Sequence, residues 1–247
     1  MLILYTHTHT HGASLDGLIN TITLGDCYNE LKKIPDKSID LVIIDPPYEM
    51  MGDGGGCFGN DKREYHDKIK PLINGINNTV LDELVRVMKK INIYIWCNKS
   101  QLRQYIDYFE GLGATTDLLT WHKTNPVPTC NNKYLSDTEY LLYFRKDGVP
   151  MYGTYATKKK YYVTPTNKED KKKYKHPTIK PLEIIKNIII NSSNEGDIVL
   201  DCFSGSGTTC VASKELNRRF IGIEIDPVYH QISLDRLNAK EFEQITF

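Results

Sequence analysis

The residues with the clearest capacity for chemistry are Asp45, Pro46, Pro47 and Tyr48, which end an apolar stretch, residues 39–44. That stretch is short, rich in β-branched residues and without alternation, as is typical of a strand buried in a parallel sheet. The two prolines cannot continue the strand and keep the chain before them extended. We therefore expect the acid at the carboxyl end of a strand, where open α/β sheets bind their ligands. A strand-ending turn without a chemical role would use the same residue types, and on this run alone it stays the alternative.

These residue types suit the holding of a flat base that carries an amino group. The lone pair of such an amino nitrogen is delocalised into the ring, so the nitrogen is a poor nucleophile. The carboxylate of Asp45 and the carbonyl of Pro46 could each accept one of its N–H bonds and so localise the pair, while Tyr48 stacks on the base. Catalysis would then be mainly positioning, and it would need no metal.

A second group of residues, 201–209, has the composition of a nucleotide site. Its sequence, Asp-Cys-Phe-Ser-Gly-Ser-Gly-Thr-Thr, follows an apolar run and precedes a predicted helix. Gly205 and Gly207 would let the backbone approach a ligand closely. Glu224 ends another predicted strand seventeen residues after Gly207 and could accept hydrogen bonds from both hydroxyls of a ribose. Because Cys210 stands where a dinucleotide fingerprint has its third glycine, the loop indicates an adenosine-containing cofactor but not which one.

Together the two motifs resemble the amino-methyltransferases of DNA that use S-adenosylmethionine, in the permuted arrangement called the β class. In that family the Asp-Pro-Pro-Tyr motif precedes the Phe-x-Gly-x-Gly motif in the chain, as it does here. Residues 176–181, His-Pro-Thr-Ile-Lys-Pro, resemble the family's segment near the methionine end of the cofactor, and Asp26 stands in the place of the acid that contacts the cofactor adenine. The similarity runs from about Thr21 to Leu237, and it includes residues 121–126 and 138–140, which resemble the strand pair that closes the family's sheet.

The resemblance implies a set of site residues. The catalytic ones are Asp45, Pro46, Pro47 and Tyr48. Those expected around the cofactor are Asp26, Cys27, Asp45, His176, Thr178, Lys180, Asp201, Phe203, Ser204, Gly205, Ser206, Gly207, Thr208, Thr209, Glu224 and Ile225. For His176 a structural role as a capped loop histidine stays open.

Composition excludes several classes of protein. The 247 residues suit one large α/β domain with a modest insertion. Lysines and arginines balance aspartates and glutamates at 31 each, so the whole chain is not a polycation, although a local basic stripe would be enough for nucleic acid. The six cysteines show neither a C-x-x-C pair nor a zinc spacing with histidine, which predicts reduced thiols and no metal. No apolar run has the length of a membrane span, no signal peptide opens the chain, and residues 6–12 alternate Thr and His like a purification tag.

Predicted strands alternate with predicted helices, which implies a doubly wound, mostly parallel sheet. By resemblance we expect the family's seven strands in a Rossmann-like methyltransferase sheet, with the strand bearing Asp201 central although it comes late in the chain. The strands are predicted at residues 21–25, 40–44, 92–97, 118–121, 140–145, 198–203 and 219–225. We expect an N-terminal extension at residues 1–20, the catalytic half of the domain at 21–146, a target-recognition insert at 147–175 and the cofactor half at 176–247.

Two segments interrupt this pattern. Residues 49–71 are rich in glycine and charge and directly follow Tyr48, so we interpret them as a lid over the site, with disorder as the alternative. The insert mixes tyrosines with lysines, and Lys158, Lys159, Lys160, Tyr161 and Tyr162 could contact phosphates and stack on bases. A solvated insert without a partner is the simpler alternative.

The expected function is therefore transfer of a methyl group from S-adenosylmethionine to N6 of an adenine that has been flipped out of DNA. N4 of cytosine is the nearest alternative. Adenine is favoured over it because the family's cytosine members more often carry Ser in place of Asp45. RNA methylation and an NAD-dependent oxidoreductase are further alternatives, and the second would leave residues 45–48 and 176–181 without a role. We expect DNA as partner, with a homodimer and a cognate restriction endonuclease as further candidates, and no membrane. The expected place of action is the nucleoid in the bacterial cytoplasm, for a protein encoded by the bacterium or by a phage.

Overall fold

The computed structural model describes residues 14–47, 75–126, 128, 134–166, 168–174 and 179–244. Three residues of the expected site, Tyr48, His176 and Thr178, lie outside this part of the chain, as do the expected lid and the tag-like start.

The centre of the molecule is a mixed sheet with the strand order β1-β8-β7-β2-β3-β5-β4-β6. All neighbouring strands pair in parallel except at β5, which is antiparallel to both β3 and β4. The strands are β1 (Thr21–Leu24), β2 (Leu41–Ile44), β3 (Asn92–Cys97), β4 (Thr115–Lys123), β5 (Thr138–Arg145), β6 (Tyr161–Thr164), β7 (Ile198–Asp201) and β8 (Arg219–Glu224).

The expected count of seven strands is wrong, because the described sheet has eight. The additional strand is β6, which comes from the middle of the predicted insert and pairs with residues Thr120 to Lys123 of β4. Its sequence, Tyr-Tyr-Val-Thr, consists of aromatic and β-branched residues that favour a pleated surface. The surrounding lysines obscure this short run in the sequence, and pairing with the otherwise open edge of β4 makes it a strand.

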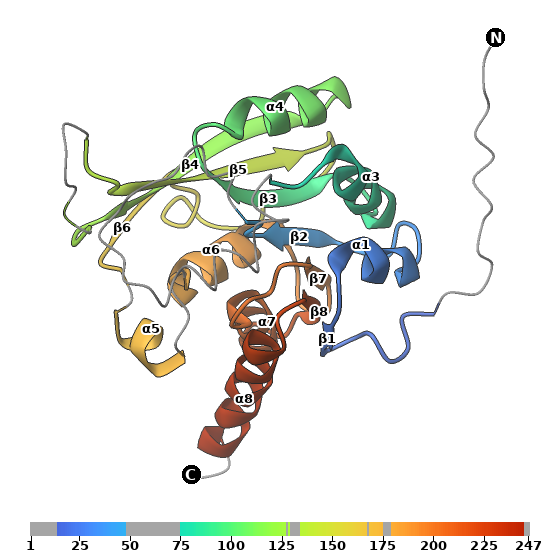
Figure 1. Cartoon of the computed structure of the whole chain (residues 1–247). Coiled ribbons are helices and arrows are strands. Elements are labelled where there is room, and N and C mark those ends of the chain that lie inside the picture. Colours follow the sequence, from blue (N-terminus) through green and yellow to red (C-terminus); the bar gives the residue numbers. More distant parts are fainter. Residues whose placement is uncertain are drawn as a thin grey trace.

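Helices cover both faces of the sheet, as the doubly wound fold class predicts (Figure 1). On one face the core packs α1 (Cys27–Glu30), the short 3-10 helix η1 (Leu31–Lys33), α3 (Asn78–Val87) and α4 (Leu102–Gly111). On the other face lie α6 (Leu182–Ser192) and α7 (Thr208–Glu215), while α8 (Pro227–Gln244) packs beside β1 and α5 (Lys168–Tyr174) follows β6. None of the helices in the described ranges is both long and apolar enough to cross a membrane.

Strand direction decides where the functional residues meet. Seven strands run the same way, so their carboxyl ends share one edge of the sheet, and antiparallel β5 begins at that edge. We call this the carboxyl edge. Asp45, which follows β2, Asp201, which ends β7, and Glu224, which ends β8, all lie there. Because β2 pairs directly with β7, the two motifs become neighbours although they lie more than 150 residues apart.

Cys210 stands where the dinucleotide pattern has its third glycine, and in this protein the facing strand, β8, provides a glycine instead. Cys210 on α7 is completely buried and packs on β8 at Gly222. A Cβ at Gly222 would lie 2.9 Å from the Cys210 sulfur and 2.8 Å from a side-chain carbon of Ile22. The close approach of helix and strand is therefore made possible by a glycine on the strand rather than on the helix.

We expect Gly222→Val to destabilise the protein by about 1–3 kcal/mol, because the added methyl groups overpack this contact. Replacing Cys210 with alanine in the same chain should recover part of the loss by removing one of the two neighbours. Urea unfolding monitored by circular dichroism measures both effects.

Gly111→Ala is a matched control, because nothing lies within 4 Å of the Cβ that it would add. An unchanged unfolding midpoint for Gly222→Val would show that the contact between α7 and β8 is looser than described.

Candidate functional site

One backbone hydrogen bond fastens the glycine-rich loop between β7 and α7 to β8, and another closes the loop on itself. The N–H of Ser204 donates to the carbonyl of Ile223 at 2.9 Å, and the N–H of Gly207 turns back to the carbonyl of Ser204 at 2.7 Å. Gly205 and Gly207 have φ angles of 52° and 76°, in the left-handed region that favours glycine. The loop therefore depends on both glycines for its shape.

Glu224 contributes to this loop in a way that the sequence did not indicate. Its carboxylate accepts hydrogen bonds from the N–H of Gly205 at 2.6 Å and from the N–H of Asp226 at 2.8 Å. Burial raises its pKa above the ordinary value, while these backbone donors oppose the rise. A carboxylate has about four lone-pair positions, so the expected contact with a ribose is compatible with both bonds.

Asp201 begins the loop and is a buried carboxyl group. One of its oxygens accepts from the N–H of Phe203 at 3.1 Å. Burial raises the pKa of Asp201 to about 7, and the nearby carboxylates of Asp45 and Glu224 act in the same direction, whereas Thr209 and the Phe203 N–H oppose it. Close to neutral pH this group can therefore change its protonation state.

Arg236 on α8 also holds the glycine-rich loop, and this role was not predicted from the sequence. Its guanidinium donates to the carbonyl and hydroxyl of Ser206 at 3.3 Å each and to the hydroxyl of Thr208 at 2.8 Å. It also lies 4.6 Å from the ring centre of Tyr174, the last residue of α5. Arg236 is 3% exposed and stands beside Leu237 on the buried face of its helix. A charged residue at such a position is the signal that could have revealed it.

Asp26 and Cys27 follow the first strand, β1, and lie at the same edge. Asp26 caps α1 by accepting from the N–H of Tyr28 at 3.1 Å. Burial, with Asp26 alongside, raises the pKa of the Cys27 thiol to about 12, so this cysteine is a neutral packing residue. Ile225 follows β8 and is about half exposed.

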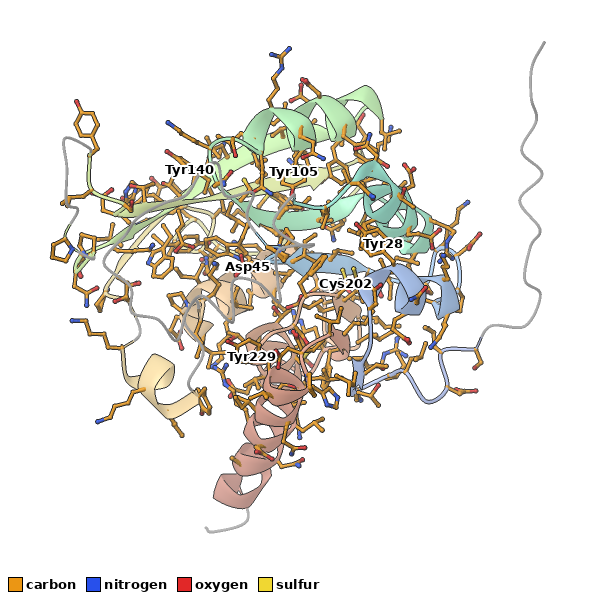
Figure 2. All side chains as sticks on the ribbon, in the orientation of Figure 1. Tyr28, Asp45, Tyr105, Tyr140, Cys202 and Tyr229 are labelled. Carbon is orange, nitrogen blue, oxygen red and sulfur yellow. The ribbon has the colours of Figure 1, made fainter. Side chains whose placement is uncertain are left out.

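Asp45 stands at the carboxyl end of β2 (Figure 2). Its carboxylate takes part in a chain of ion pairs. Its Oδ2 lies 2.7 Å from Nζ of Lys180, and the same ammonium lies 3.0 Å from Oε2 of Glu139 on β5. Glu139 in turn pairs with Lys123, the last residue of β4, at 2.6 Å. The Lys180 ammonium also lies 4.9 Å from the ring centre of Trp96 on β3. Of these partners only Lys180 belonged to the expected site, and the structure places its ammonium against the carboxylate of Asp45, which the sequence predicts to be catalytic.

The lysines expected to grip DNA lie apart from this edge. Lys160 precedes β6 and forms an ion pair with Asp117 near the start of β4, and Lys158 donates to the carbonyl of Met151. Thr157, which precedes Lys158, accepts a hydrogen bond at its carbonyl from the side chain of Asn191, near the carboxyl end of α6. Four residues of β6, about 13 Å of strand, separate Lys160 from the carboxyl edge.

The two tyrosines of the same group differ from each other. Tyr161 is 55% exposed. Tyr162 instead packs against the core beside α6, and its hydroxyl accepts a hydrogen bond from the side chain of Asn187.

The loop and its neighbours fit an adenosine-containing cofactor. The hydroxyl of Ser204 is buried and has no hydrogen-bond partner among the described residues, which marks a polar atom prepared for a ligand. Asp26 and Glu224 follow or end two neighbouring strands, β1 and β8, so both acids lie at the same edge as the loop. Within the described ranges no group of three metal-ligating side chains gathers.

Comparisons with known proteins agree with this geometry. Residues 39–235 match the family described as DNA methylase. The chain is 34% identical to the type II methyltransferase M2.LlaDCHI of Lactococcus lactis subsp. cremoris, over 86% of this chain and 87% of the relative. It is 33% identical to M2.DpnII of Streptococcus pneumoniae, over 87% and 88%.

Two solved structures extend the agreement to three dimensions. M1.HpyAVI in complex with S-adenosylmethionine is 28% identical, superposes with a TM-score of 0.60, and covers 88% of this chain and 99% of its own. The cytosine-N4-specific PvuII DNA methyltransferase has a TM-score of 0.67 at 18% identity, over 87% and 85%, and shows the shared fold alone. The expected fold class and the expected enzyme class, a DNA methyltransferase, are confirmed, and the solved complex agrees with the expected cofactor.

Asp201 predicts a pH dependence of stability. Its pKa is raised in the folded protein from the ordinary 3.8 to about 7, so the folded state binds the proton more tightly than the unfolded state. Its contribution to stability is present below pH 4 and is lost as the pH rises towards and through 7. Asp201→Asn keeps an acceptor for the Phe203 N–H and does not titrate, so its free energy of unfolding should improve relative to the natural protein over that interval.

Urea unfolding of both proteins at several pH values between 4 and 8 measures the difference. A difference that stays constant across this range would contradict the raised pKa.

Proposed function

Since this chain belongs to the DNA methylase family, we propose that it transfers the methyl group of S-adenosylmethionine to N6 of an adenine in DNA. The observation that carries the proposal is the position of Asp45. It stands at the end of β2, directly beside the strand that begins the glycine-rich loop, and it is held by the buried ammonium of Lys180. A fixed carboxylate next to a cofactor loop is what an amino-directed methyl transfer requires.

The roles of the residues follow from their chemistry. Asp45 accepts one N–H of the adenine amino group and the carbonyl of Pro46 accepts the other, which turns the nitrogen lone pair towards the cofactor. When bound, S-adenosylmethionine supplies a methyl group on a sulfonium, a leaving group that departs as a neutral thioether without protonation. The nitrogen then carries an extra proton, which Asp45 is placed to accept. Tyr48 stacks on the base, and the base reaches this pocket by flipping out of the duplex at a cost of a few kcal/mol.

Different residues are proposed to hold different parts of S-adenosylmethionine. Glu224 takes the ribose, Asp26 takes the adenine amino group, and the loop from Asp201 to Thr209 surrounds the chain of atoms that leads to sulfur. Lys180, with His176 and Thr178, belongs to the methionine end. The geometry that supports this division is the common edge on which Glu224, Asp26 and the loop meet.

Adenine N6 is favoured over cytosine N4 because position 45 holds Asp and not the Ser that is more common among cytosine enzymes of this family. We further propose that the protein serves a restriction–modification system, because its relatives are named type II methyltransferases. A cognate endonuclease and action on DNA in the bacterial cytoplasm fit that assignment, and a homodimer stays a separate prediction.

Target recognition is proposed for residues 147–175. Within this segment, the helix α5 is proposed to contact DNA more closely than the lysines before β6. Helix α5 lies between β6, which ends at the carboxyl edge, and the segment that leads to Lys180. Lys168 and Lys172 are exposed on this helix, and its last residue, Tyr174, contacts the arginine that holds the glycine loop. These lysines are better placed for DNA beside the active site than Lys158, Lys159 and Lys160.

Asp45→Ala should lower methyl transfer at least roughly hundredfold, because the group that activates the nitrogen is lost. Affinity for S-adenosylmethionine should stay within a few-fold, since the loop and Glu224 are untouched. Transfer of labelled methyl groups to DNA, followed by mass spectrometry of the nucleosides, measures the rate and identifies the product as N6-methyladenine.

Asp107→Ala is the matched control, since Asp107 is an exposed carboxylate on α4 that forms an ion pair with Arg103 at 3.3 Å, far from the carboxyl edge in the described part of the chain. Activity near the natural level in Asp45→Ala, or N4-methylcytosine as the product of the natural protein, would refute the corresponding part of the proposal.

The lysines can be compared in pairs by neutralisation to glutamine. Changing Lys168 and Lys172 together should weaken DNA binding and flatten the slope of log affinity against log salt by up to about two phosphate units. Changing Lys158 and Lys160 together should have a smaller effect, because both already have partners within the protein. Fluorescence anisotropy of labelled DNA over a salt series measures the slope for each double variant. Equal slopes would contradict the preference for Lys168 and Lys172 and would leave the DNA contacts spread over the whole segment.

A further inference from the structure

Four charged groups of alternating sign follow one another along the carboxyl edge. They are Lys123 at the end of β4, Glu139 on β5, Lys180 before α6 and Asp45 after β2, joined at 2.6, 3.0 and 2.7 Å. The strand order β2-β3-β5-β4 places Asp45, Glu139 and Lys123 in sequence across the edge, and Lys180 bridges Asp45 and Glu139. The chain of charges therefore spans four neighbouring strands and ends on the proposed catalytic carboxylate.

All of these groups lie on the same face of the sheet. Glu139 and Leu141 alternate on β5 with the same orientation, and Leu141 pairs with Trp96 in the core beneath α6. Lys123 shares its face with Trp121, which meets Trp96 edge to face at a centroid distance of 6.3 Å. The two indole rings form an apolar floor beneath the ion pairs.

Lys180 needs more than Asp45 to keep its position. A lysine side chain has four rotatable bonds, and holding it in one conformation costs rotamer entropy. Its ammonium is buried, with the side chain 6% exposed, so it also requires more than one compensating contact. Glu139 and the Trp96 ring supply them, and Lys123 holds Glu139 from the other side.

We propose that Glu139 is a positioning residue for methyl transfer, which holds the ammonium of Lys180 against Asp45 and thereby fixes the carboxylate that receives the amino group of the base. This inference rests on the proposed function, because it takes Asp45 as the group that activates the amino nitrogen. Glu139 itself touches neither the reacting nitrogen nor the methyl group. Its effect passes through Lys180, and that of Lys123 passes through Glu139.

The charge state of Glu139 is suited to this role. Burial alone would raise the pKa of Glu139, but the ammonium groups of Lys180 and Lys123 lower it to about 2. The carboxylate therefore stays ionised throughout the neutral range, and the support that it provides is independent of pH there.

The test uses Glu139→Gln, Lys123→Met and the double variant of the full-length protein. Steady-state methylation of DNA gives kcat and the KM values for S-adenosylmethionine and DNA, and calorimetry gives cofactor affinity. Glu83→Gln is the matched control, since Glu83 is a carboxylate of similar exposure that pairs with Arg86 at 2.7 Å on α3.

Glu139→Gln should lower kcat roughly tenfold to a hundredfold, because small displacements of a catalytic group have effects of this size. Both KM values and cofactor affinity should change by less than about threefold, as expected for a loss of alignment rather than binding. Lys123→Met should lower kcat less, because Glu139 still holds Lys180 in that variant. The double variant should be no slower than Glu139→Gln, because both changes act through the same contact.

An unchanged kcat in Glu139→Gln would overturn the inference, as would additive effects of the two changes or a change confined to the KM for DNA. If Glu139→Gln does not fold, Lys123→Met decides alone: a lower kcat at unchanged KM supports the inference, and an unchanged kcat overturns it. Failure of the proposed function would be recognised separately, because the natural protein itself would then methylate no adenine.

Discussion

The arrangement of the site depends on one buried cation, the ammonium of Lys180, held between the carboxylates of Asp45 and Glu139. A buried charge is tolerated only where opposite charges and hydrogen bonds compensate it. Two acids meet this requirement here, one of which is the proposed catalytic group. Stability and catalysis thus require the same contact, so the compensation of Lys180 also orients Asp45. The Trp96 and Trp121 rings below exclude water and strengthen these interactions.

Strand direction brings the remaining parts to this contact. Because β2 pairs with β7, the two motifs lie side by side although the catalytic one comes first in the chain. Glu224 has a structural bond to Gly205 in addition to its proposed contact with the ribose, and Arg236 holds the same loop from α8. Loop shape and cofactor recognition therefore share residues, and Tyr174 links Arg236 to the helix proposed to meet DNA.

Much of the fold could be predicted from local patterns, while contacts between distant residues could not. Apolar β-branched runs located the central strands, and the Asp-Pro-Pro and glycine motifs located the carboxyl edge. The eighth strand was missed because β6 is a four-residue run within a lysine-rich segment, and only its partner β4 makes it a strand. Glu139 and Arg236 were missed because their roles depend on partners 41 and 28 residues away. Composition could not place the lysines before β6 either, because it does not reveal at which edge of the sheet a segment lies, and their expected contact with DNA stays a prediction.

The central claim is that Asp45, held by Lys180, receives the amino group of adenine beside the glycine-rich loop. The most direct measurement is a crystal structure of the protein with target DNA and sinefungin, an unreactive analogue of S-adenosylmethionine. The account predicts a flipped adenine whose N6 lies about 3 Å from the Asp45 carboxylate, with Lys180 still paired to Asp45 and Glu139. A Lys180 ammonium moved away from Asp45, or an adenine held by other groups, would contradict it.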